Sequence, residues 1–276
     1  MTAVTITRRA AFPTVDAADI PTYRDAVAAW DAYRVAAGFS PGAEILTSPG
    51  ENLKLTKGRW PIFGLSLASA RTSGRNVCLD STPACRRLCL HTAGKGALPR
   101  NQAIRALRTR FYFDHPETFV SLVVGEIERG MRAYRDVPRI GWRPNVLSDI
   151  PWEDVAPIMV GPRPRVRAYD YTKTWDRTGT DRYTLTYSRS ERTRDVDILE
   201  AVGGGRNVAV PFTTARGRRL PRRYLGIPVI DGDMTDYRVT DPAGVIVGIR
   251  AKGRARMRAY RNGGFVVNAD GPSCTG

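Results

Sequence analysis

The sequence has little of what hydrolytic active sites and membrane proteins require. Its 276 residues include two histidines, His91 and His115, which argues against a Ser–His–Asp triad. No window approaches the roughly 18 to 20 uninterrupted apolar residues that a membrane span needs, and the first residues lack the apolar core of a signal peptide. We therefore expect a cytoplasmic protein with no membrane partner.

Lysine is also scarce, whereas arginine is abundant. Of 43 basic residues five are lysines and 38 are arginines, and with 27 acidic residues the net charge is +16. Arginine binds phosphate bidentately, and neutralised phosphates release counterions, so this composition favours nucleic acid as a partner. A genome rich in G and C, which favours arginine codons, is the alternative explanation.

Arginine is concentrated in three stretches, residues 100–110, 216–223 and 250–261. The first is followed directly by the aromatic residues 111–113, and basic residues next to aromatic rings suit a single strand, because guanidinium groups track phosphates and rings stack on bases. A solvated helix face beside core aromatics is the alternative. The predicted contacts to single-stranded DNA or RNA are Arg100, Arg105, Arg108, Arg110, Arg218, Arg219, Arg222, Arg254 and Arg256.

Short apolar runs alternate with helical patterns over most of the chain. This alternation predicts parallel β/α units and an α/β fold, a partial or distorted β/α barrel over residues 45–276. Residues 1–44 are predicted to be a helical N-terminal segment, an appendage with one helix within 21–38. The expected strands are 61–67, 143–147, 166–169, 183–187, 207–212, 227–230 and 245–249, and the expected longer helices are 99–113, 116–134 and 194–201.

Polar residues follow several of the expected strands. Asp149 follows the second strand, Asp170 and Lys173 follow the third, and residues 188–191 and 231–233 follow two others. In β/α barrels, catalytic groups gather at the carboxyl ends of the strands. Polar turns, which occur in every protein, are the alternative. From this pattern we predict that Asp149, Asp170 and Lys173 form a polar face for a substrate.

Three of the four cysteines fall within twelve residues, in a loop directly after the first expected strand. Cys78, Cys85 and Cys89 have the spacing C-x6-C-x3-C, and such cysteines in a cytoplasmic chain indicate metal ligands more than disulfides. A [4Fe–4S] cluster fits this spacing, because it accepts varied loops and tolerates three protein ligands. A zinc site completed by His91, whose spacing is poor, and unligated thiols remain as alternatives.

The fourth cysteine, Cys274, determines the chemistry of such a cluster. As a fourth ligand it would close the cluster, whereas with three ligands one iron could bind a substrate or S-adenosylmethionine. Cys274 lies in a terminal segment that contains glycine and proline, and we expect three ligands.

The segments around this loop resemble a known family. NLKLTKGRWPIFGLSLASARTSGRNVC and STPACRRLCLHTAGKG, with SDIPW, YDYTK and TLTYSRSER downstream, are similar over about residues 50–267 to the "gene product 88" domain family of actinobacterial phages. The resemblance implies a phage protein that acts in the host cytoplasm during infection, and it implies no particular reaction.

The layout also resembles the radical S-adenosylmethionine enzymes, which place a three-cysteine loop after the first strand of a partial β/α barrel. Those enzymes usually have the spacing C-x3-C-x2-C with an aromatic residue before the last cysteine, where this chain has Leu88. The resemblance implies Cys78, Cys85 and Cys89 as cluster ligands.

Two function classes therefore stay open. The first is an iron–sulfur protein that binds nucleic acid, with single-stranded DNA as the favoured partner, through its arginine-rich surfaces. The second is a radical S-adenosylmethionine-type enzyme that modifies a nucleotide or another phage or host target. A zinc protein or a purely structural role is a third interpretation, and the sequence leaves open whether the protein is an enzyme.

Overall fold

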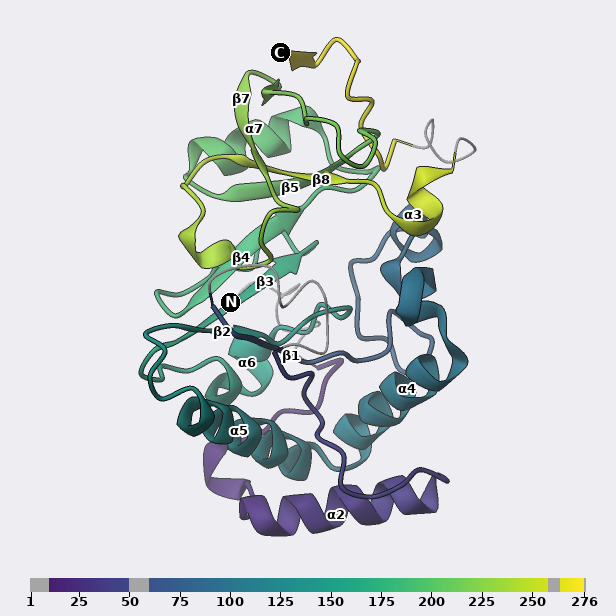
Figure 1. The fold of residues 1–276 in the computed structure, drawn as a ribbon, viewed down its shortest axis with the longest axis vertical. Coiled ribbons are helices and arrows are strands. Elements are labelled where there is room, and N and C mark those ends of the chain that lie inside the picture. The colour runs from purple at the N-terminus through teal and green to yellow at the C-terminus, as the bar shows by residue number, and fades with distance from the viewer. Residues whose placement is uncertain (1–9, 50–59, 258–263, 276) are drawn as a thin grey trace.

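The computed structural model describes residues 10–49, 60–257 and 264–275 (Figure 1). In this part of the chain a nine-stranded sheet has the order β1-β2-β3-β4-β5-β8-β7-β6-β9. Neighbours from β1 to β7 in this order are parallel, whereas β6 is antiparallel to both β7 and β9. The strands are β1 (Ile62–Gly64), β2 (Ile140–Arg143), β3 (Val166–Thr172), β4 (Tyr183–Ser188), β5 (Asn207–Phe212), β6 (Arg223–Tyr224), β7 (Ile227–Asp231), β8 (Ile246–Arg250) and β9 (Cys274–Thr275).

The mostly parallel, open sheet confirms the predicted α/β class and partial-barrel architecture. Its first five strands are neighbours in sequence order, as in a barrel built from successive β/α units. The helices are α2 (Tyr23–Ala36), α3 (Pro83–Arg87), α4 (Pro99–Asp114), α5 (Pro116–Ala133), α6 (Trp152–Val155) and α7 (Asp195–Gly203). Short 3₁₀ turns are η1 (Ala17–Asp19), η2 (Leu90–Thr92), η3 (Gly94–Ala97), η4 (Pro157–Met159), η5 (Arg238–Thr240) and η6 (Gly253–Arg256).

The helices α4 and α5 begin where the sequence predicts. Each has a proline in its first turn, where the missing N–H would have no helical partner. In α5 the apolar residues form one face, and Phe119, Val123 and Ile127 are buried in the larger core cluster beside β1 and β2.

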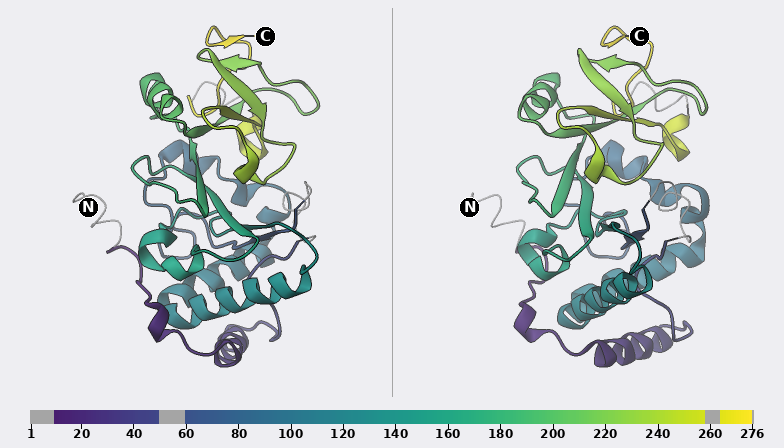
Figure 2. Two further views of the ribbon diagram at one scale, coloured as in Figure 1. Left: turned by 90° about the vertical axis from the view of Figure 1, so that its left-hand side faces the viewer. Right: turned by 60° about the vertical axis from the view of Figure 1, so that its left-hand side comes forward.

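The N-terminal helix α2 is part of this core and is not an appendage. Figure 2 shows α2 lying against α5 as the outer layer at this end of the molecule. Trp30 is 1% exposed and belongs to the same cluster as the residues of α5. At Gly125 a Cβ would lie 2.1 Å from the Tyr23 ring, so a glycine is required for the two helices to pack this closely.

The second expected strand, residues 143–147, differs from the observed β2. The second strand ends at Arg143, because Asn145 turns the chain: its backbone N–H donates to the buried Asp170, and its side-chain amide donates to Ile150 O. The segment between β5 and β7 contains no helix crossover, since β8 lies between these strands and β6 forms a short hairpin with β7. The sequence did not predict α3, α6, β6 or β9.

Within the described residues, no helix is both long enough and apolar enough to cross a membrane.

Candidate functional site

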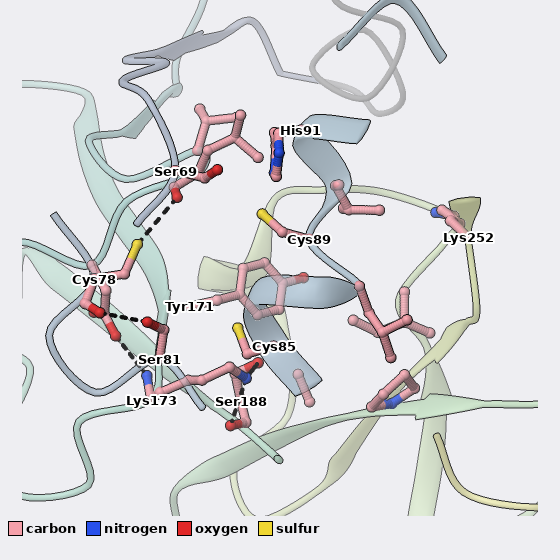
Figure 3. A pocket seen from close by; sticks show the side chains of 18 of the residues that line it. Ser69, Cys78, Ser81, Cys85, Cys89, His91, Tyr171, Lys173, Ser188 and Lys252 are labelled. Atoms are coloured by element: carbon pink, nitrogen blue, oxygen red, sulfur yellow. Dashed lines mark hydrogen bonds between the residues drawn. The ribbon is translucent and has the colours of Figure 1, made fainter. Parts of the chain in front are cut away.

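A cavity of about 500 Å³ lies at the carboxyl ends of the parallel strands and beside the cysteine loop (Figure 3). Its wall includes Arg143 at the end of β2, Lys173 after β3, Ser188 at the end of β4 and Arg250 at the end of β8. Cys78, Cys85 and Cys89 all line it as well. The loop after the first strand and the carboxyl ends of the strands therefore form one site.

The helix α3 places Cys85 on this wall. Pro83 starts the helix, and the hydroxyl of Thr82 accepts a hydrogen bond from the backbone N–H of Cys85 at 3.2 Å. Glu191, which follows β4, accepts hydrogen bonds from the Thr82 hydroxyl at 2.6 Å and the Ala84 N–H at 3.0 Å. A carboxylate from a distant part of the chain thus holds the start of this short helix.

Cys78 is held by backbone groups of two other segments. Its sulfur accepts from Ala70 N–H at 3.4 Å and donates to Leu147 O at 3.4 Å. In Figure 3 the side chains of Cys85 and Cys89 extend from α3 and its C-terminal end toward the segment that carries Cys78. The three thiols therefore face a common space.

Burial controls the protonation of these thiols. Burial raises the pKa of Cys78 and of Cys85 above the usual value of 9.0, and charge repulsion from Cys89 raises both pKa values further. The Lys173 ammonium group acts in the opposite direction on the pKa of Cys85. Ionising several of these thiols together requires a compensating positive charge, which a bound metal centre supplies.

Four buried polar atoms of residues on the cavity wall have no hydrogen-bond partner in the described structure. They are Ser69 Oγ, on a side chain that is 3% exposed, His91 Nδ1, Arg143 Nε and Arg189 Nε. Buried polar groups are nearly always hydrogen-bonded, so these atoms are available to a bound group. Among residues 10–49, 60–257 and 264–275, no set of three or more His, Cys, Asp or Glu side chains is arranged to hold a metal ion.

The structure separates the three residues predicted as a polar face. Lys173 lines the cavity, where its ammonium group donates to Ser188 Oγ at 3.1 Å and Arg189 O at 3.2 Å. Asp149 also lines the cavity and forms a 2.7 Å ion pair with Arg177.

Asp170 does not line this cavity, and its predicted place on the polar face is wrong. Its side chain is 0% exposed and accepts hydrogen bonds from Asn145 N–H at 2.9 Å and Tyr183 OH at 2.5 Å. Burial raises the pKa of Asp170 to about 7. Asp170 holds the turn after β2 in place, because one of its oxygens accepts from the backbone N–H of Asn145 and the other accepts from the Asn145 side-chain amide and Tyr183 OH.

The predicted nucleic-acid residues also divide by exposure. Arg105 is 8% exposed and donates to Gly96 O at 2.9 Å, so it is not on the surface, and Arg108 is half-buried with a 3.0 Å bond to Glu44 O. The predicted stacking of bases on residues 111–113 is wrong for Phe111 and Tyr112, which are fully buried core residues. The exposed members of the set are Arg100, Arg110, Arg218, Arg219, Arg222, Arg254 and Arg256.

One of the three arginine stretches lies directly against the cysteine loop. Leu88 at the end of α3 packs in one small cluster with Ala255 of η6, and a Cβ at Gly253 would lie 2.8 Å from Ala93 Cβ. Figure 1 shows η6 beside α3. Residues 258–261 of this stretch lie outside the described residues.

The exposed Arg254 and Arg256 of η6 therefore flank the cavity together with the exposed Arg86 and Arg87 of α3. Arg86 and Arg87 are not among the nucleic-acid contacts predicted from the sequence. Their position between Cys85 and Cys89 could have indicated from the sequence that they lie beside the site.

Cys274 lies apart from the other cysteines. It is in β9, at the far edge of the sheet, where it pairs with Tyr224, and its sulfur donates to Asn268 O at 3.5 Å. Cys274 does not line the cavity.

Comparisons with known proteins bear on origin but not on chemistry. Neither the curated proteins nor the solved structures contain a match to this chain, so the comparisons do not support the resemblance to radical S-adenosylmethionine enzymes. The model of one protein family, Gene product 88, matches residues 43–267. This match covers the cysteine loop, every strand from β1 to β8 and the cavity between them, and the chain therefore belongs to the phage family Gene product 88.

Proposed function

We propose that this phage protein holds a [4Fe–4S] cluster on Cys78, Cys85 and Cys89 and binds nucleic acid beside it. The observation that carries the proposal is the convergence of three thiols on one cavity that is flanked by exposed arginines. The preferred partner is single-stranded DNA or RNA, because the arginines lie on short, separate turns and not on one continuous face that follows a duplex.

The residues present fit a cluster better than a single metal ion. A cubane binds each thiolate through a different iron, so its ligand sulfurs do not converge on one atom. The unpartnered Ser69 Oγ and His91 Nδ1 are suited to donate hydrogen bonds to sulfur, which tune such clusters. Lys173 near Cys85 and Arg105 near Cys89 supply positive charge to offset the thiolates. When bound, the cluster would supply a redox centre or an open coordination position at its fourth iron.

The cluster proposal is tested by matched cysteine variants. The protein is purified and reconstituted without oxygen, and iron and sulfide are measured per chain. Cys78→Ser, Cys85→Ser and Cys89→Ser should each lose most of the iron, whereas Cys274→Ser should retain the parental content, because Cys274 lies at the other edge of the sheet. A parent that takes up no iron and sulfide, or equal loss in all four variants, would overturn the proposal.

Nucleic-acid binding is tested by charge reversal at two places. Arg254→Glu with Arg256→Glu should weaken the binding of a labelled single-stranded oligonucleotide at least tenfold at low salt. The matched control is Arg132→Glu with Arg135→Glu, which makes the same change of charge at exposed positions near the end of α5. Equal weakening in both double variants would show attraction by net charge alone, and no binding by the parent would remove this half of the proposal.

A radical S-adenosylmethionine-type enzyme is the second candidate. It is favoured by one observation: the thiols line a cavity large enough for a small molecule at the carboxyl ends of parallel strands, and Cys274 lies elsewhere. Electron paramagnetic resonance of the reduced, iron-loaded protein distinguishes the two candidates. A signal that shifts on addition of S-adenosylmethionine would favour the enzyme, whereas an unshifted signal with intact oligonucleotide binding would favour the first proposal.

A further inference from the structure

The wall of the cavity carries more positive than negative charge. Seven basic side chains face three acidic ones, and a cavity of about 500 Å³ is within the size range of small-molecule sites. The basic residues are Arg71, Arg86, Arg143, Lys173, Arg189, Arg250 and Lys252, and the acidic residues are Asp149, Asp233 and Asp236. This balance favours an anionic ligand, and the question is which side chain would bind its charged group.

Arg143 is a buried arginine of the wall whose hydrogen bonds leave one edge of the guanidinium unpartnered. Arg189 Nε also has no partner in the described residues, but Arg189 is only half-buried. Nη1 donates to Asp236 Oδ2 at 2.7 Å, and Asp236 also accepts from Tyr169 OH at 3.2 Å. Nε, in contrast, is buried and has no partner within the described residues. Nε and Nη2 form the edge of the guanidinium that binds two oxygens of a carboxylate or phosphate at once.

The guanidinium of Arg143 is also held in place before any ligand arrives. Its side chain is 9% exposed, and its Cζ lies 4.9 Å from the centre of the Tyr171 ring. The contact with the ring and the ion pair with Asp236 together restrict the plane of the group. A fixed, desolvated donor edge binds an anion more strongly than a mobile surface arginine does, because little freedom remains to be lost.

Arg250 lines the same cavity but has no such edge. Its Nη1 bonds to Asp231 Oδ1 at 2.8 Å and to Asp233 Oδ2 at 3.2 Å, while Nε and Nη2 donate to Arg218 O at 3.1 Å and 2.7 Å. Every nitrogen of this guanidinium therefore has an acceptor within the protein. The two arginines form a natural pair for comparison.

We infer that Arg143 is the anion-binding residue of the cavity, and that its Nε–Nη2 edge binds the carboxylate or phosphate group of a small molecule. The inference goes beyond the proposed function, because it concerns a small-molecule ligand and requires neither the cluster nor the exposed arginines. It also differs from general electrostatic attraction, which would depend equally on Arg250.

The test is calorimetric titration of the anaerobically purified protein at low salt with three probes: inorganic phosphate, adenosine 5′-monophosphate and glutamate. The first two report a phosphate ligand, and the third reports a carboxylate ligand. Arg143→Lys keeps the charge beside Asp236 but removes the two-donor edge, and it should weaken binding of the preferred probe at least tenfold. Arg250→Lys should weaken it less than threefold.

Four results would overturn the inference. The first is no binding of any probe at millimolar concentration, and the second is parental affinity in Arg143→Lys. The third is an equal loss in the two variants. The fourth is a loss in Arg143→Lys that disappears when the heat of binding is expressed per mole of folded protein. Circular dichroism of each variant establishes the folded fraction. Iron is measured in the same samples, so that failure of this inference and failure of the cluster proposal can be told apart.

Discussion

The arginines of this protein form two groups that the sequence does not distinguish. Arg177 is 6% exposed, and its guanidinium bonds to Glu153 through Nε and Nη2 at 2.7 and 2.8 Å and to Asp149 through Nη1 at 2.7 Å. Arg254 and Arg256 are exposed on η6, beside the cysteine loop. The first group stabilises the folded protein through its buried ion pairs, and the second is exposed and can meet a partner.

Because of this difference, the net charge of the chain overstates the number of arginines that can bind phosphate at the surface. The charge of +16 counts Arg105, Arg143, Arg177 and Arg238 with the surface arginines, although each of the four is at least nine-tenths buried. A buried arginine that already binds carboxylates or carbonyls does not meet phosphate on a surface. The variants below separate the two groups by stability and by binding.

The largest effect is expected at Arg177. Arg177→Met leaves the carboxylates of Asp149 and Glu153 without their guanidinium partner, and breaking a buried pair from one side typically costs about 3 to 5 kcal/mol. Urea unfolding followed by circular dichroism measures this loss. Arg254→Met, at an exposed position, should change the free energy of unfolding by less than about 0.5 kcal/mol. Similar losses in the two variants would contradict the division into two groups.

A smaller effect is expected at Glu126, a buried carboxyl group that binds backbone N–H groups in place of an arginine. It accepts from Ile45 N–H and Leu46 N–H, both at 2.8 Å, and burial raises its pKa from the usual 4.5 to about 7. Between these two pH values the folded state retains a proton that the unfolded state has lost. Stability should therefore fall as the pH rises from 4.5 to 7, by up to about 3 kcal/mol.

Glu126→Gln tests this pH dependence, because the amide resembles the protonated carboxyl group and does not titrate. The free energies of unfolding of parent and variant are compared at pH 4.5 and pH 8. From pH 4.5 to pH 8 the free energy of unfolding of the parent should fall because Glu126 titrates, whereas that of Glu126→Gln should not fall for this reason. The stability of the variant relative to the parent should therefore rise by about the amount that the parent loses. A difference between parent and variant that is the same at both pH values would show that burial does not raise the pKa of Glu126 in the folded state.

Much of the fold could be predicted because its signals are local. Apolar runs and proline-started helices gave α4, α5, β3, β4, β5 and β8 to within a few residues. The two-residue strands β6 and β9 and the five-residue helix α3 have too few residues for a periodic pattern. Their positions depend on tertiary partners, such as Glu191 for the start of α3.

The candidate site was predicted less completely, for a physical reason. The sequence predicted the cysteine loop and Lys173 at the carboxyl ends of the strands, and Cys78, Cys85 and Lys173 line one cavity there, because loops after parallel strands meet at one edge of the sheet; their roles stay predictions. It could not show that Asp170 is buried or that Arg143 has an unpartnered Nε, since both depend on side chains more than twenty residues away in the sequence, Asn145 and Asp236. Arg250, which ends β8, and Lys252, which follows it, could have been found by the same strand-end rule.

The smallest expected effect concerns single arginines and the salt dependence of oligonucleotide binding. Each phosphate contacted on a single strand contributes about 0.7 to the slope of log affinity against log salt. Arg256→Gln should therefore lower the slope by about this amount and leave the urea midpoint unchanged, because the side chain is exposed. Arg105→Gln should do the opposite: it loses the buried bond to Gly96 O and with it stability, while the slope stays at the parental value. If Arg105→Gln lowered the slope as much as Arg256→Gln, the buried arginines would contribute to phosphate binding, and the distinction between the two groups would fail.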